Sequence, residues 1–305
     1  MTGKITKLIA LSILLLICSC RNTSTKDGGL AFPATDSPAS GAAEKPGEEA
    51  IADIVQNIGS PVEIAATMQA MQVPYSAEYL ASSRGSDRLT TNFQKAIMLG
   101  IYGADLVYLN MYERTGSSVD VLSTINKLAD GLHVGQFFDF ETIKRLSLSK
   151  SNLDSLLFLS VSSYNKIDSY LRDNGRVSVS ALMIAGVWIE GLYMATQVAA
   201  SYPDKVLMNR IGEQKLVLGD LLMLLRPYRH SSKEYSSLYK MMEQISEAYS
   251  AVNISYRLGE PETVEEDGRL VMIQHEESIV EMSNEQLAAI TGISEDMRNK
   301  LISGQ

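Results

Sequence analysis

The stretch ALMIAGVWIEGLYMATQVAA, residues 181–200, decides the fold because it is long, apolar on every face and carries one charge, Glu190. A helix that is apolar all round is either the core of a large helical bundle or a membrane span. A carboxylate near the centre of a span is costly, and the flanks lack the basic and aromatic residues that border spans. We therefore expect a buried central helix over residues 178–201.

A second segment, AIMLGIYGADLVYL at residues 96–109, has the same character and also carries one charge, Asp105. In both segments a glycine is followed by a β-branched residue, an aromatic residue and then a carboxylate. Small residues allow two helix backbones to approach closely, so we expect the two helices to pack together. Either a weak internal repeat or chance explains the likeness. The small residues available for the contact are Gly100, Gly103, Ala104, Ala185, Gly186 and Gly191.

Helical patterns cover most of the rest of the chain, separated by short connections that favour antiparallel neighbours. Helix-starting residues precede several of them, among which Ser60, Asp139, Ser151, Ser232 and Ser283 are expected caps. The sequence predicts an all-α, antiparallel helical bundle of about eight to ten helices in a domain over residues 50–305. The expected helices are 89–114, 117–132, 140–149, 152–173, 178–201, 204–226, 233–255 and 284–303, besides one that starts at Ser60.

One segment interrupts the helical pattern, near residues 257–277. Glu266-Asp267-Gly268 has the composition of a turn and lies between two short runs able to pair. We therefore expect a small β-hairpin there.

The two carboxylates are the residues of the predicted core that could have a chemical role. An acid inside an apolar bundle has to be hydrogen-bonded, ion-paired or protonated. One interpretation is a structural polar pair that fixes helix register. The other is a ligand pocket between the helices, polar at Asp105 and Glu190 and lined by aromatics such as Tyr102 and Trp188. The structural interpretation is favoured, and an acid/base pair as in glycosidases has no supporting motif.

Other chemistry finds little support in the sequence. His133, His230 and His275 are scattered without the spacing of metal ligands, and no glycine-rich nucleotide loop is present. The net charge is −9, without a strongly basic run, so nucleic acid is not an expected partner. We therefore expect no catalytic residue, no metal and no cofactor.

The first residues have the pattern of an export signal. Lys4 and Lys7 precede an apolar run of about 11 residues, which is shorter than the ~20 residues of a spanning helix. The run ends in Ile17-Cys18-Ser19-Cys20, which resembles a bacterial lipobox. The resemblance implies cleavage after Ser19, so that residues 1–19 are the signal peptide, a diacylglyceryl group on the Cys20 sulfur, and acylation of the new amino group. An ordinary secretory signal with two bystander cysteines is the alternative.

Residues 20–49 follow as an expected flexible tether, because they are rich in small and polar residues and in proline. About 29 such residues reach roughly 30 Å from the anchor. The residues directly after Cys20 are not acidic, which favours a periplasm-facing anchor, with the outer membrane as the expected location. The expected partners are the membrane, through the lipid, and an envelope protein.

Four segments of the chain are similar to a group of uncharacterised helical lipoproteins of Bacteroidetes bacteria. They are SPVEIA from Ser60, KAIMLGIYGADLVYLNMYERT from Lys95, LADGLHVGQFFDFETIKRL from Leu128 and GVWIEGLYMATQVA from Gly186. The resemblance implies an envelope location and a helical fold, and brings no catalytic residue with it.

Three functions fit the sequence. The first is a membrane-anchored envelope lipoprotein with a non-enzymatic scaffold or adaptor domain. The second is a binding protein that holds a small or lipidic ligand between the central helices, at about 89–114 and 178–201. The third is an enzyme that uses Asp105 and Glu190.

Overall fold

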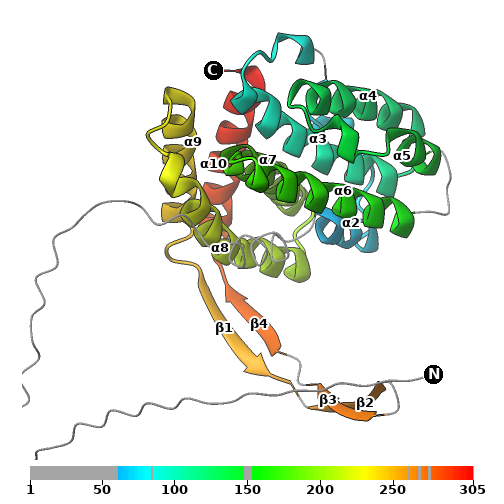
Figure 1. Cartoon of the computed structure of the whole chain (residues 1–305). Coiled ribbons are helices and arrows are strands. Elements are labelled where there is room, and N and C mark those ends of the chain that lie inside the picture. The colour runs from blue at the N-terminus through cyan, green and yellow to red at the C-terminus, as the bar shows by residue number, and fades with distance from the viewer. Residues whose placement is uncertain are drawn as a thin grey trace, which may run out of the picture. The chain divides into compact units, whose positions relative to one another are not determined.

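The computed structural model describes residues 61–83, 85–147, 153–259, 261–266, 269–273 and 276–304. This part of the chain forms nine α-helices and four β-strands (Figure 1). The mostly helical architecture confirms the predicted fold class. The predicted signal peptide, the tether, Cys20 and the helix cap at Ser60 lie outside the described residues. The helices are α2 (Pro61–Ala70), α3 (Asn92–Met111), α4 (Thr115–Gly131), α5 (Phe140–Ser147), α6 (Leu153–Asp173), α7 (Val177–Ser201), α8 (Lys205–Leu225), α9 (Lys233–Ala248) and α10 (Asn284–Ser303).

Four short 3₁₀ turns complete the helical part of the described chain. They are η1 (Ala77–Tyr79), η2 (Ser86–Arg88), η3 (Gly135–Phe137) and η4 (Arg226–Tyr228).

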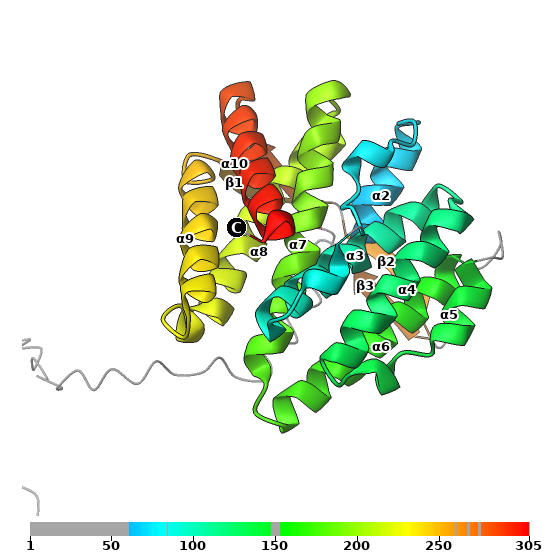
Figure 2. The same cartoon turned by 90° about the horizontal axis from the view of Figure 1, so that it is seen from above.

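Helix α7 is the central element, and α2, α3, α6, α8 and α10 all contact it (Figure 2). Among the described helices, it is the one long and apolar enough to cross a membrane, and 83% of its most apolar window is buried inside the protein. Residues 178–201 thus form the buried central helix that the sequence predicts, and other helices cover its apolar faces.

Helices α3 and α7 touch through their backbones at two glycines. A Cβ on Gly100 would overlap the carbonyl oxygen of Met183, and one on Gly186 would overlap that of Ile97. The expected close approach is therefore confirmed at these two positions. Gly103 takes no part, because a Cβ there has no described atom within 4 Å, and Gly191 faces the Ile64 side chain of α2 instead.

Side-chain caps fix several helix starts where the sequence predicts them. Ser232 accepts a hydrogen bond from the Tyr235 amide at the start of α9, and Ser283 forms a full capping box with Gln286 at the start of α10. These bonds satisfy amide groups that the first helical turn leaves without partners. Asp139 likewise accepts a bond from the Thr142 amide at 3.0 Å, and the predicted cap at Ser151 lies outside the described residues.

The predicted hairpin is present and longer than expected. Strands β1 (Asn253–Leu258) and β4 (Glu276–Glu281) pair antiparallel, as do β2 (Glu262–Glu266) and β3 (Arg269–Ile273). The expected helix over 233–255 is wrong in its last turns, because α9 ends at Ala248. The alternating run Asn253-Ile254-Ser255-Tyr256 favours a strand, and the pairing with β4 satisfies its backbone.

Candidate functional site

Glu190 of α7 forms a buried ion pair with Arg298 of α10. The arginine donates from Nε to Oε2 at 3.1 Å and from Nη2 to Oε1 at 2.9 Å. Glu190 is 0% exposed and Arg298 is 7% exposed. The planar guanidinium matches both carboxylate oxygens, which gives the pair strength and a fixed orientation.

Two further contacts hold the Arg298 guanidinium in place. It lies over the Tyr193 ring, 4.2 Å from the ring centroid, and a cation over an aromatic face is attracted by the ring quadrupole. Nη2 also lies 3.4 Å from the Tyr79 carbonyl oxygen, to which it donates. Arg298 thereby ties α10 to α7 and to the chain segment that precedes α3.

Asp105 of α3 lies beside this ion pair and is also fully buried. Its Oδ2 accepts a hydrogen bond from the Ala81 amide at 3.1 Å, whereas Oδ1 has no amide or hydroxyl donor among the described residues. Burial raises the pKa of Asp105 well above its ordinary value, and the adjacent Glu190 carboxylate raises it further. When Asp105 keeps its proton, it donates a hydrogen bond to the Glu190 carboxylate, and this bond satisfies the remaining oxygen.

The proton belongs on Asp105 because Arg298 contacts the other acid. Burial raises the pKa of Glu190 as well, but the Arg298 hydrogen bonds and charge oppose the shift. The three side chains therefore carry one shared proton, one carboxylate charge and one guanidinium charge. We call this overall neutral group the Asp105–Glu190–Arg298 network.

The aromatic side chains expected beside the acids make their hydrogen bonds elsewhere. Tyr102 lies beside the network, where burial and then the nearby acids raise its pKa to about 12, but its hydroxyl donates to the Ser82 carbonyl at 2.9 Å. Trp188 donates to Gln214 of α8 at 3.0 Å. The structure thus brings Asp105, Glu190 and Tyr102 together and leaves Trp188 on another face of α7.

Polar side chains along α3 hold the segment 71–83 against this helix. The Tyr112 hydroxyl donates to the Val73 carbonyl at 2.9 Å, and the Tyr108 hydroxyl accepts from the Ser76 amide at 3.0 Å. The segment covers the network, because its Ala81 amide donates a hydrogen bond to Asp105. The residues that bond to it are Tyr102, Asp105 and Tyr108 of α3 and Tyr112, which caps the end of this helix.

Arg298 is the member of the network that the sequence analysis missed. Its signal is a basic residue in line with the apolar face of α10, four residues after the buried Ser294 and next to the buried Met297. A cation at such a position has to find an acid or to reach water. The acids available to such a cation were Asp105 and Glu190, because each carries a carboxylate in the predicted core that needs a partner. The structure pairs Arg298 with Glu190.

A second buried polar cluster joins α6 to α7. Asp168 forms an ion pair with Arg172 at 2.7 Å and accepts a hydrogen bond from the Ser180 hydroxyl. The ion pair lies within α6 and holds Asp168 in place, and the Ser180 hydrogen bond joins α6 to α7, so this cluster also stabilises packing. In the described parts of the chain, no three His, Cys, Asp or Glu side chains are grouped so as to hold a metal ion.

The chain was compared with protein-family models, curated proteins and solved structures, and none of them matches it. The role of the network is therefore inferred from its own geometry. Both acids are shielded from solvent and are satisfied by each other, by Arg298 and by a backbone amide. This arrangement suits the fixing of three helices relative to one another, and it offers no exposed acid or base to a substrate.

Proposed function

We propose that the protein is a membrane-anchored envelope lipoprotein whose helical domain is a non-enzymatic scaffold or adaptor. The observation that carries this proposal is the complete burial of Asp105 and Glu190, with Glu190 paired to Arg298. These acids are the residues on which an enzymatic function would have rested. With their charges compensated inside the fold, the outer faces of the helices are what the domain presents to other molecules.

The alternative, a small or lipidic ligand between the central helices, has less support. Gly100 and Gly186 bring the backbones of α3 and α7 into direct contact where the two helices cross. A ligand between them would have to separate these backbones. The buried aromatic residues near the crossing are also engaged with protein partners.

The anchoring part of the proposal rests on the lipobox-like sequence that ends at Cys20. Each CH₂ of an acyl chain that enters a bilayer adds about 0.8 kcal/mol of membrane affinity, so several chains hold a protein without a spanning helix. The proposed location is the outer membrane, with the domain facing the periplasm. Residues 20–49 would let the domain contact partners at a typical distance of roughly 30 Å from the surface.

Fractionation of cells that express Cys20→Ala tests the anchor. We expect the variant to lose acyl labelling and the membrane association that its lipid provides. Cys18→Ala is the matched control and should remain labelled and membrane-bound. If Cys18→Ala instead loses the label while Cys20→Ala keeps it, the proposed anchor residue is wrong.

Affinity capture of the anchored chain from native membranes, after mild crosslinking, tests the adaptor function. Mass spectrometry of proteins and of small molecules in the same sample should reveal one or more envelope proteins at near-stoichiometric amounts. Cys20→Ala serves as the control, because an unanchored chain should lose partners that meet it at the membrane. Recovery of a small molecule at one equivalent, with no enriched protein, would contradict the proposal.

A further inference from the structure

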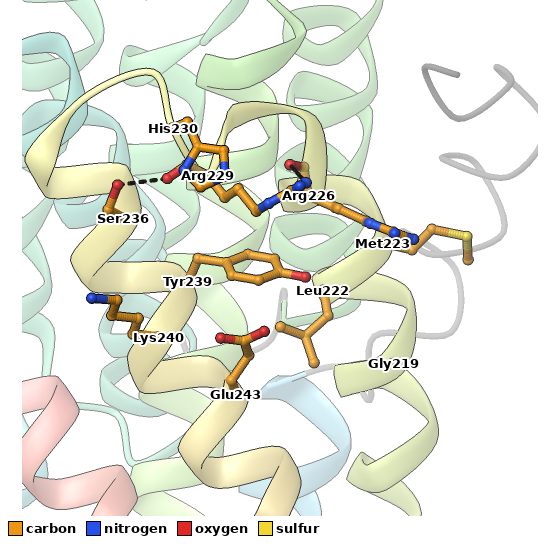
Figure 3. A pocket seen from close by; sticks show the side chains of 10 residues that line it. All are labelled: Gly219, Leu222, Met223, Arg226, Arg229, His230, Ser236, Tyr239, Lys240 and Glu243. Atoms are coloured by element: carbon orange, nitrogen blue, oxygen red, sulfur yellow. Dashed lines mark hydrogen bonds between the residues drawn. The ribbon is translucent and has the colours of Figure 1, made fainter. Parts of the chain in front are cut away.

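A surface pocket of about 690 Å³ lies between the end of α8, the turn η4 and α9 (Figure 3). The residues that line it lie far from Asp105 along the chain, and none of them belongs to the Asp105–Glu190–Arg298 network. Polar, basic and apolar side chains all contribute to its walls. The lining includes Leu222, Met223, Arg226, Arg229, Tyr239 and Glu243.

The pocket concentrates positive charge in an acidic chain. Arg226, Arg229 and Lys240 line it together with one acid, Glu243, whereas the whole chain has a net charge of −9. Within the described residues, none of the three cations forms an ion pair with a carboxylate. Cations without acidic partners at a concave surface attract anions, because the surrounding field is focused there.

Internal hydrogen bonds hold the basic side of the pocket in shape. Arg229 donates from Nη1 to the Arg226 carbonyl at 2.9 Å, and the Ser236 hydroxyl donates to the Arg229 carbonyl at 2.6 Å. The first bond satisfies a carbonyl at the end of α8, and the second joins η4 to α9. Arg229 is thus held by the fold, whereas the Arg226 side chain is exposed and has no hydrogen-bond or ion-pair partner among the described residues.

The side chains that face the pocket differ from one side to the other. In the view of Figure 3, Arg226 and Arg229 extend along one side, and Tyr239 separates them from Glu243. Leu222 and Met223 form an apolar edge, and Met223 is 51% exposed. A ligand that spans the pocket would meet guanidinium groups, a phenol hydroxyl and an apolar wall.

We propose that this pocket binds the phosphate group of an organic phosphate. Guanidinium forks match phosphate oxygens and donate charge-assisted hydrogen bonds to them, and the apolar edge suits the organic part of the ligand. A soluble phosphate ester and a phospholipid headgroup share this chemistry. The proposal stands whether or not Cys20 is acylated, since it rests on α8, η4 and α9 alone.

Calorimetric titration of the full-length chain in a neutral detergent tests the proposal and separates the two sources. The probes are inorganic phosphate and glycerol 3-phosphate for the soluble source, phosphatidic acid in mixed micelles for the lipid source, and diacylglycerol as the phosphate-free control. We expect saturable binding of at least one phosphate probe, weakened by added salt, and none of diacylglycerol. Binding of the soluble probes alone supports a phosphate ester, and binding of phosphatidic acid alone supports a headgroup.

Three substitutions decide whether the binding occurs in this pocket. Arg226→Gln should weaken it at least about tenfold through the loss of charge-assisted bonds, and Glu243→Gln should tighten it by removing a repelling charge. Lys205→Gln, which removes the same charge from the exposed first residue of α8, should change it less than about twofold at moderate salt, because exposed charges are screened over about 10 Å. The proposal is overturned if no phosphate probe binds, or if Arg226→Gln and Lys205→Gln have equal effects.

Discussion

Two groups of charges in this protein have opposite surroundings. In the core, Asp105, Glu190 and Arg298 are buried and satisfy one another. At the end of α8, Arg226 is exposed and lacks an acidic partner among the described residues, next to a surface pocket. The comparison teaches that the most unusual residues of the sequence stabilise the fold, whereas the ordinary surface cations are the ones available to a ligand.

Burial accounts for the difference. A charge taken out of water has to be compensated by a partner, so one unpaired member of a buried group is strongly destabilising. An exposed arginine keeps its hydration and costs little when it has no partner. Substitutions in the two regions should therefore differ in their effect on stability, and this contrast is open to measurement.

Glu190→Leu should have the largest effect, a loss of about 3–5 kcal/mol in the free energy of unfolding, because it leaves Arg298 buried without its carboxylate. Denaturant unfolding followed by circular dichroism measures it. Arg226→Gln is the control from the other region and should change stability by less than about 0.5 kcal/mol. Equal losses in the two variants would contradict the contrast between the regions.

A double variant sharpens the same prediction. Glu190→Leu combined with Arg298→Met removes both members of the ion pair, so no charge remains unpaired. Its loss of stability should be clearly smaller than the sum of the two single losses, since contacting residues are not additive. Additive losses would mean that the pair is not coupled.

The glycine contact between α3 and α7 should give the next largest effect. Gly100→Ala and Gly186→Ala each place a methyl group against a backbone carbonyl of the facing helix, and we expect each to cost about 1–3 kcal/mol. Gly103→Ala, with open space at its Cβ, should instead be stabilising by up to about 1 kcal/mol. Thermal unfolding of the three variants measures the difference, and a destabilised Gly103→Ala would argue against the packing described.

A smaller effect is expected for Tyr102, whose hydroxyl bonds to the segment over the network. Tyr102→Phe removes the hydrogen bond to the Ser82 carbonyl and should cost about 0.5–1.5 kcal/mol. Tyr256 of β1 is 58% exposed, so Tyr256→Phe should be nearly neutral. A neutral Tyr102→Phe would show that this bond does not stabilise the fold.

Much of the fold could be predicted because it depends on local patterns. The central helix follows from an uninterrupted apolar run. The Gly100–Gly186 contact follows from small residues in the most apolar parts of α3 and α7. The end of α9 was not predictable to the same accuracy, since residues 249–255 also suit a helix and the pairing with β4 decides their structure.

The site was predictable only in part because partners far apart in sequence are chosen by packing. The sequence indicates that Asp105 and Glu190 need compensation, but Arg298 lies 108 residues from Glu190 along the chain. Trp188 was expected beside the acids, yet its position on α7 turns it toward Gln214 of α8. The rotation of a helix that is apolar all round is not encoded in its periodicity, since every face is equally suited to burial.

The pH dependence of stability, compared between wild type and Asp105→Asn, tests the shared proton most directly. In the fold Asp105 keeps its proton because burial raises its pKa, whereas in the unfolded chain it ionises near its ordinary value of 3.8. The unfolded chain then binds fewer protons than the folded chain. The free energy of unfolding of the wild type should therefore fall as the pH rises above about 4, by up to about 1.4 kcal/mol per pH unit from this group.

Asp105→Asn keeps both hydrogen bonds without a titrating proton, since the amide donates to Glu190 and its carbonyl accepts from Ala81. The measurement is urea unfolding of both proteins from pH 4 to pH 8. The variant should gain stability relative to the wild type as the pH rises through this range. Parallel curves, or a wild type that gains relative to the variant, would contradict a protonated Asp105 in the Asp105–Glu190–Arg298 network.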